Sequence, residues 1–295
     1  MNTCSLLAKY KNGNYTVRLF SDGTKIRFTL DDEFNAMFPE SIDIKITNYC
    51  DISCLMCHED SSTKGVHGNL EHPFLDTLVA GTELAIGGGN PLSHPGLLSF
   101  LNKMSKQGVI CNLTVNQNHF IKNLDYLQSL INDKLIYGLG VSLNNDYKLD
   151  ELIDFCNKNP GVVIHVIAGV IDMKLLERLY DHGLKLLILG FKEFGRGINY
   201  YNDIVRSKIT FLKDNILDIS THFYILSFDN LAITQLDMKK KISEEDYERY
   251  YMGDDGKFTM YIDLVKEEFS VSSTKSERYR LSNNIVDMFS YVKSL

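Results

Sequence analysis

Three cysteines are concentrated in the segment TNYCDISCLMC, in a chain of 295 residues that contains six cysteines in all. Cys50, Cys54 and Cys57 follow the spacing C-x3-C-x2-C. Closely spaced thiolates can bind zinc, form a redox pair or hold an iron-sulfur cluster. A four-iron cluster normally takes four cysteines, so a triplet would leave one iron open to another ligand.

The alternatives to a cluster each leave something unexplained. Zinc would need a fourth ligand from His58 or His67, but His58 directly follows Cys57, and adjacent residues do not readily face one metal. A redox pair of Cys54 and Cys57 leaves Cys50 without a role. Cysteines that are simply buried in the hydrophobic core would not be expected to cluster in a polar loop. The cluster is therefore favoured, and a zinc-stabilised binding protein is the alternative of another class.

The elements that must position this triplet follow an alternating pattern. The first 40 residues read as a β ribbon and a polar link, because YTVRLF and KIRFTL alternate apolar with polar residues. Apolar runs of strand length then alternate with amphipathic stretches of helix length. This rhythm predicts repeated βα units with parallel strands. The strand candidates are 42–47, 83–88, 109–115, 136–143, 162–169 and 184–191.

The expected fold class is α/β, a partial (β/α)6 TIM-like barrel with an N-terminal β ribbon and a small C-terminal α+β cap. The expected domains are 1–40 for the ribbon and link, 41–200 for the core and 201–295 for the cap. Residues 50–57 directly follow the first core strand. Ligand sites of parallel α/β sheets form at the carboxyl ends of the strands, which is where the thiols should lie.

The triplet, placed after the first strand of a six-fold βα repeat, resembles the radical S-adenosylmethionine (radical SAM) superfamily over about residues 41–200. The resemblance implies a 4Fe-4S cluster held by Cys50, Cys54 and Cys57, with S-adenosylmethionine on the open iron. It also implies reductive cleavage to a 5'-deoxyadenosyl radical that abstracts hydrogen. An external electron donor such as flavodoxin or ferredoxin would supply the reducing electron.

The resemblance further implies a cofactor-binding rim at the later strand ends. Its Gly-Gly-Glu-Pro turn corresponds to Gly88, Gly89, Asn90 and Pro91, with an amide in place of the carboxylate. An amide oxygen still accepts a hydrogen bond from an ammonium group but contributes no charge. The other rim candidates are Asn116, Ser142, Asn144, Val170, Leu189 and Gly190. His165, inside the fifth core strand, is expected to be a core histidine with its hydrogen bonds satisfied.

Substrate candidates follow the sixth core strand, where Lys192, Glu193 and Arg196 are expected to face the active site. A peptide or protein side chain is the favoured substrate, because the β ribbon could add a strand to an extended peptide. A nucleobase or nucleotide-derived small molecule is the alternative. No cysteine follows Cys156, so the C-terminal region is expected to hold no auxiliary cluster.

The composition of the chain limits the classes of partner that we expect it to bind. A formal net charge of −7 argues against broad affinity for nucleic acid. No apolar run reaches the roughly 20 residues that cross a bilayer, and the first residues lack the pattern of a signal peptide. A cytoplasmic protein without membrane contact is expected.

Overall fold

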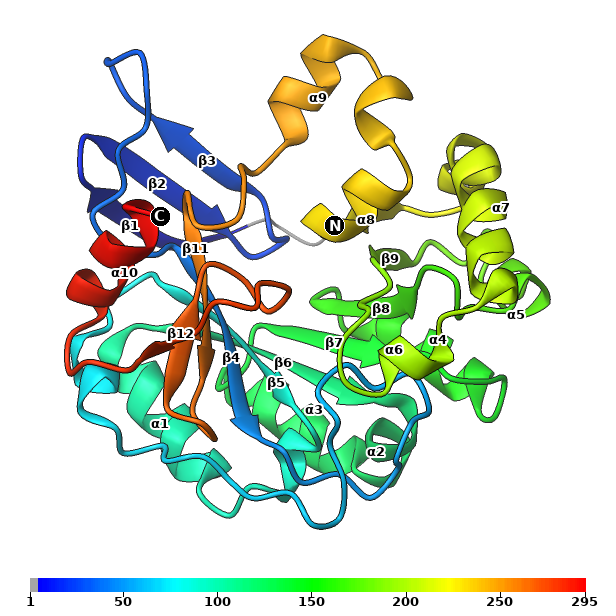
Figure 1. Ribbon diagram of the computed structural model, residues 1–295, viewed down its shortest axis with the longest axis horizontal. Helices are drawn as coiled ribbons and strands as arrows, with labels where there is room; N and C mark the ends of the chain where they lie inside the picture. Colours follow the sequence, from blue (N-terminus) through cyan, green and yellow to red (C-terminus); the bar gives the residue numbers. More distant parts are fainter. Residues whose placement is uncertain (1–4) are drawn as a thin grey trace.

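The structure is a computed structural model that describes residues 5–295, so Cys4 lies outside the described residues. It contains two sheets (Figure 1). The strands are β1 (Leu6–Asn12), β2 (Tyr15–Phe20), β3 (Lys25–Phe28), β4 (Ser41–Thr47), β5 (Glu83–Gly88), β6 (Ile110–Asn116), β7 (Gly138–Ser142), β8 (Val162–Ile167), β9 (Lys185–Leu189), β10 (Ile225–Phe228), β11 (Thr259–Asp263), β12 (Glu268–Ser270) and β13 (Tyr279–Arg280).

The helices lie mostly between consecutive strands. The α-helices are α1 (Leu97–Gln107), α2 (Gln117–Lys122), α3 (Leu124–Asn132), α4 (Leu149–Lys158), α5 (Met173–Glu177), α6 (Gly197–Tyr200), α7 (Asp203–Ser220), α8 (Asn230–Gln235), α9 (Glu244–Tyr250) and α10 (Ile285–Lys293). The 3-10 helices are η1 (Pro73–Thr77), η2 (Pro91–Ser93) and η3 (Met238–Lys240). No described helix is both long enough and apolar enough to span a bilayer.

The predicted N-terminal ribbon is a three-stranded antiparallel sheet of order β1-β2-β3. Its inner face buries Tyr15, Val17 and Leu19. The ribbon is joined to the start of β4 through Glu40, which is fully buried. The Glu40 carboxylate accepts from Tyr15 Oη at 2.6 Å and from Arg27 Nε and Nη2 at 2.8 and 2.9 Å. Because the carboxylate has three donors, its burial is compensated.

The main sheet has ten strands in the order β10-β9-β8-β7-β6-β5-β4-β11-β12-β13, with parallel pairing from β10 to β4. Alternate residues of β4 point to opposite faces: Ile42, Ile44 and Ile46 are buried in the hydrophobic core, and Asp43 and Lys45 lie on the other face. A mixed α/β architecture with a large, mostly parallel sheet is confirmed.

Residues 201–295 contribute strands to both edges of the main sheet. After α7, β10 pairs in parallel with β9 and so continues the βα repeat. The chain then crosses to the other side, where β11 pairs in parallel with β4, and β12 and β13 follow in antiparallel pairing (Figure 1). The division into a core of 41–200 and a cap of 201–295 stays a prediction, since these strands belong to the same sheet as the predicted core.

Candidate cofactor site

The cysteine loop, residues 48–62, begins where β4 ends at Thr47. Cys50, Cys54 and Cys57 are partly exposed free thiols within it. Cys50 N donates to Ser62 O at 2.9 Å, which closes the loop at its base. The thiols lie at the carboxyl edge of the parallel strands, as the sequence predicts.

Arg196 holds this loop in place. Its Nε donates to Cys54 O at 2.9 Å, Nη1 to Asp60 Oδ1 at 2.8 Å and Nη2 to Ser61 O at 2.9 Å. Its backbone N–H donates to Cys57 O at 3.0 Å. Arg196 was predicted to hold substrate. All of these donors bind the cysteine loop, and contact of Arg196 with substrate stays a prediction.

The electrostatics of Cys54 show that the three thiols influence one another. Burial raises the pKa of the Cys54 thiol, and the neighbouring Cys57 and Cys50 raise it further, whereas Arg196 opposes them. A bound metal centre removes this mutual repulsion by coordinating the thiolates.

A single zinc ion does not fit the triplet. The three thiols do not form a group of donor atoms within 4.8 Å of one another among the described residues, although sulfur ligands of one tetrahedral zinc lie about 3.8 Å apart. The two histidines proposed as a fourth ligand are engaged elsewhere. His67 Nδ1 lies 2.8 Å from Thr47 Oγ1, and His58 Nε2 lies 3.4 Å from Glu59 Oε1. The donor set suits a larger, cysteine-ligated cluster.

Asp51 and His119 lie beside Cys50 and were not predicted. Each of the three offers a ligand atom within 4.8 Å of the others. His119 Nε2 is 2.6 Å from Asp51 Oδ1, however, which is a hydrogen-bond distance. Nitrogen and oxygen ligands of one tetrahedral zinc lie about 3.4 Å apart. The hydrogen bond from His119 holds the pKa of Asp51 below its usual range and tethers α2 to the cysteine loop.

The glycine turn after β5 packs against the start of the cysteine loop. Gly88 has φ of +112°, and a Cβ there would lie 2.4 Å from Thr47 O. A Cβ on Gly89 would lie 2.2 Å from Tyr49 O. Glycine is therefore required at both positions by close backbone approach.

Asn90 has a local task in this turn. Its Oδ1 accepts from Leu92 N at 3.2 Å and caps η2, while Ser93 Oγ donates to its backbone carbonyl at 2.6 Å. The predicted use of Asn90 Oδ1 as an acceptor for an ammonium group competes with this cap.

Asn116 and Asn144 bind each other. Asn144 Nδ2 donates to Asn116 Oδ1 at 2.6 Å, and Asn116 Nδ2 donates to Asn144 Oδ1 at 3.1 Å. Asn116 Nδ2 also lies 4.0 Å from Cys54 Sγ. Fully buried Gln117, which was not predicted, fixes the loop that carries Asn144 by accepting from the backbone N–H groups of Asn144 and Asn145.

His165 belongs to the same register row as Asn116 and Ser142, because Asn116 pairs with Ser142 and Ser142 with His165. It was predicted to be a satisfied core histidine. Its buried Nδ1 has no partner among the described residues, so that prediction is wrong. Burial lowers the pKa of His165 to about 4, which leaves the imidazole neutral at neutral pH. The ring lies over Gly140, where a Cβ would meet Cε1 at 2.1 Å.

The remaining rim candidates have backbone partners inside the protein. Leu189 O accepts from Ala168 N at 2.8 Å, and Gly190 N donates to Asp229 Oδ1 at 2.9 Å. Val170 O accepts from Lys208 Nζ at 3.0 Å. The amide of Gly190 is therefore not free for a cofactor. Leu189 also lines the cavity described next.

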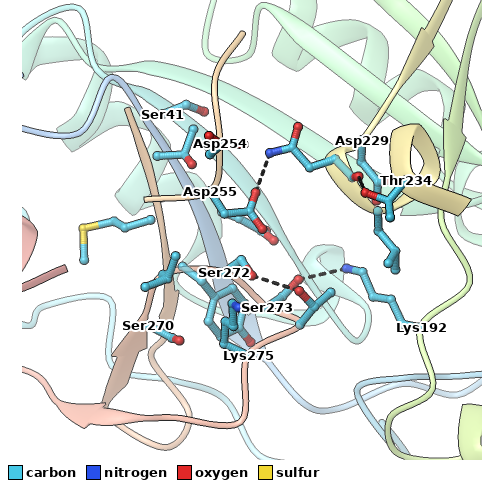
Figure 2. Close-up of a pocket in the computed structure, with 18 of the residues that line it drawn as sticks. Ser41, Lys192, Asp229, Thr234, Asp254, Asp255, Ser270, Ser272, Ser273 and Lys275 are labelled. Carbon is cyan, nitrogen blue, oxygen red and sulfur yellow. Dashed lines mark hydrogen bonds between the residues drawn. The ribbon is translucent and has the colours of Figure 1, made fainter. Parts of the chain in front are cut away.

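A cavity of about 1030 Å³ lies between the main sheet, α8, α9 and the C-terminal strands (Figure 2). Lys192 reaches it and donates to Ser273 Oγ at 2.9 Å, and its Nζ is 3.4 Å from His58 Nε2. The third substrate candidate, Glu193, is exposed and is not part of the lining. The cavity thus lies next to the cysteine loop through the Lys192–His58 contact.

A buried ion-pair network connects the loop to the sheet. Lys45 Nζ lies 2.6 Å from Glu59 Oε2 and 3.3 Å from Asp263 Oδ2. Burial alone would raise the pKa of Glu59, but the hydrogen bond from His58 and the Lys45 charge hold it well below its usual range. The network joins β4, the cysteine loop and β11.

No protein-family model and no curated protein matches this sequence. Crystal structures of SuiB from Streptococcus suis resemble it. The structure bound to precursor peptide SuiA has a TM-score of 0.62 at 13% identity, over 86% of this chain and 65% of SuiB. The structure bound to S-adenosylmethionine has a TM-score of 0.55 at 14% identity, over 83% and 64%. A third SuiB structure has a TM-score of 0.57 at 15% identity, over 86% and 66%. The chain spans about two thirds of the length of SuiB, and its fold is that of SuiB.

Proposed function

We propose that this chain is a radical SAM enzyme that holds a 4Fe-4S cluster on Cys50, Cys54 and Cys57. The observation that carries the proposal is the set of three free thiols on a loop at the carboxyl edge of the parallel strands, packed against a glycine turn. The likeness to SuiB, which was crystallised with S-adenosylmethionine, supports it. When bound, the cluster supplies an electron that cleaves S-adenosylmethionine to a hydrogen-abstracting 5'-deoxyadenosyl radical.

The protein's own groups position the cofactors. Arg196 and Ser62 hold the loop that carries the thiolates. Gly88 and Gly89 bring the turn after β5 close to that loop, and Asn90 shapes the turn by capping η2. The S-adenosylmethionine site is then completed by the rim residues Asn116, Ser142, Asn144, Val170 and Leu189.

The proposed substrate is a peptide or protein side chain. SuiB was crystallised with a precursor peptide, and the cavity beside the cysteine loop is large enough for several side chains of a peptide. We also propose that the parallel strands form a partial barrel around this cavity. The reducing electron would come from an external donor such as flavodoxin or ferredoxin.

Anaerobic reconstitution with iron and sulfide tests the proposal. We expect about four irons per chain, a brown protein and 5'-deoxyadenosine when dithionite and S-adenosylmethionine are added. The Cys54→Ser variant should lose most of the iron and all of the cleavage. The matched control is Cys156→Ser, outside the loop, which should retain both. A colourless protein that binds one zinc, or cleavage that persists in Cys54→Ser, would refute the assignment.

A further inference from the structure

The cavity beside the cysteine loop has an unbalanced set of charges. Its acidic lining residues are Asp43, Asp229, Asp254, Asp255 and Glu277, and its basic ones are Lys192 and Lys275. Tyrosine side chains from α9, β11 and β13 form part of the wall. Figure 2 shows Lys192 directed towards Ser273, with Asp255 in the interior of the cavity. Five carboxylates against two ammonium groups give the cavity a negative potential.

Three of the carboxylates have protein donors. Asp229 Oδ1 caps α8 by accepting from Ala232 N at 2.7 Å, and it also accepts from a second backbone amide. Asp255 Oδ1 accepts from Asn230 Nδ2 at 2.6 Å, and Asp254 Oδ1 accepts from the Tyr251 hydroxyl. The hydrogen bonds of these three carboxylates hold α8 and the segment after α9 in place. Their charges add to the negative potential of the cavity, although each already has a hydrogen-bond donor in the protein.

Asp43 is different. It projects from the middle of β4 into the cavity, and no described residue donates a hydrogen bond to its carboxylate or forms an ion pair with it. Lys192 is the basic residue whose charge acts on the Asp43 carboxylate, yet its ammonium group binds Ser273 and contacts His58. The Asp43 side chain is exposed to the cavity, so its carboxylate is open to a ligand, and a positively charged group that enters the negative cavity would gain an ionic contact there.

The ionisation of Asp43 agrees with this geometry. Enclosure by the protein raises its pKa to about 6; Lys192 opposes the rise, and Glu59, Asp229 and Asp255 add to it. A cation that meets Asp43 would relieve this repulsion. Its binding should therefore strengthen as the pH rises through about 6, where the free carboxyl loses its proton.

An organic cation fits better than a metal ion. Among the described residues, none of these carboxylates belongs to a set whose donor atoms lie within 4.8 Å of one another, so a metal would find no ready ligand shell. An ammonium or guanidinium group needs only one carboxylate. Its aliphatic stem can pack on tyrosine rings, which also attract its charge.

We propose that this cavity receives a lysine or arginine side chain of the peptide substrate, whose charged head meets Asp43. The inference rests on the proposed function, in which the substrate is a peptide. It adds the chemical class of the side chain that is recognised and the residue that recognises it.

Binding of capped pentapeptides to the reconstituted protein tests the inference by calorimetry. The probes are acetyl-Gly-Gly-X-Gly-Gly-amide with lysine, arginine, norleucine or glutamate as X, together with uncapped pentaglycine. We expect the lysine or arginine peptide to bind at least tenfold more tightly than the norleucine peptide near pH 7, and less tightly near pH 5. Equal affinity for norleucine, or tighter binding of glutamate, would overturn the proposal. Equal binding of uncapped pentaglycine would identify a terminal amine and would also overturn it.

The variant Asp43→Asn should weaken binding of the cationic peptide about tenfold or more, because it removes the charge and keeps the shape. It should fold, since it removes an unpartnered carboxylate. The exposed residue Asp214 on α7 provides the matched control, and Asp214→Asn should bind as the parent does. Unchanged binding in Asp43→Asn, or displacement of the peptide by magnesium chloride beyond that by sodium chloride of equal ionic strength, would refute the assignment.

The two proposals fail separately. Absence of a cluster and of 5'-deoxyadenosine in the parent protein counts against the radical SAM function. An intact cluster and normal cleavage, combined with no preference for a cationic side chain, count against the role of Asp43 alone.

Discussion

Arg196 shows how one side chain can organise a cofactor loop. Its guanidinium group reaches two backbone carbonyls and one carboxylate of the cysteine loop. A guanidinium presents several donors in a fixed plane, whereas a lysine ammonium is a single point on a flexible stem. The geometry of the loop therefore depends on arginine specifically.

The variant Arg196→Lys should reduce cluster content after reconstitution to about half or less, because two or more of the three side-chain contacts are lost. Iron and sulfide analysis, with electron paramagnetic resonance of the reduced protein, measures this. The control is Arg178→Lys, whose exposed ion pairs with Asp146 and Asp150 lie on the surface. A full complement of iron in Arg196→Lys would show that the cysteine loop keeps its geometry without the side-chain contacts of Arg196.

Gly140 is predicted to be intolerant of a methyl group. A Cβ there would lie 2.1 Å from Cε1 of His165, so Gly140→Ala should lower the free energy of unfolding by about 1–3 kcal/mol. Urea denaturation measures it. Gly87→Ala is the matched control, since nothing lies within 4 Å of its Cβ position. Adding His165→Ala to Gly140→Ala should recover part of the loss, and strict additivity would argue against the contact.

At this scale the sequence predicted that three thiols share one loop after the first core strand, but it did not predict the partners of the polar rim residues. Spacing alone indicates that Cys50, Cys54 and Cys57 work together. The mutual pairing of Asn116 and Asn144 could not be predicted, because it depends on how loops after two different strands approach each other. The orientation of His165 likewise depends on a glycine in the neighbouring strand.

Among the elements, the contact between β4, the cysteine loop and β11 is the most consequential. Lys45 is almost fully buried between Glu59 of the loop and Asp263 of β11. Breaking a buried pair leaves an uncompensated charge, which costs much more than the pair contributes. The loop is thus fixed to the sheet by electrostatics.

The variant Glu59→Gln should lower the free energy of unfolding by about 1–3 kcal/mol near pH 7, because Lys45 loses its shorter ion pair and keeps Asp263 as its second acidic partner. The folded-state pKa of Glu59 is lowered, so its contribution is complete above its unfolded pKa of about 4.3 and is lost as the pH falls through the lower folded value. The difference between parent and variant should therefore shrink below about pH 4. Urea denaturation at several pH values checks this, with the exposed residue in Glu248→Gln as the control. A difference that does not change with pH would contradict the ionic role.

The succession of strands from β4 to β9 was predictable, and the positions of the later strands were not. Apolar runs and regular spacing mark each βα unit locally. Nothing local indicates that β10 extends one edge of the sheet and β11 the other, because edge choice is decided by which surface remains uncovered after the central strands have paired. For that reason the region after residue 200 was predicted as a separate cap.

For the whole molecule, the burial of the cysteines predicts their reactivity. In cluster-free protein, Cys50, Cys54 and Cys57 should react with iodoacetamide first, because they are partly exposed. Burial raises the pKa of both Cys111 and Cys156 to about 12, so they should react at least tenfold more slowly. Peptide mass spectrometry over time gives the order. After unfolding in urea, these five cysteines should react at similar rates. Early labelling of Cys111 or Cys156 in the folded protein would contradict the fold.

The pairing of β4 with β11 also sets an order of events during synthesis. The cysteine loop leaves the ribosome early, but the strand that carries Asp263 follows more than two hundred residues later. At about 5–20 residues per second, the interval is on the order of ten seconds or more. During that time Lys45 lacks one of its two acidic partners, and one edge of β4 is open. Metal loading should therefore follow the pairing of β11 with β4, and a nascent chain arrested before β11 should not retain iron.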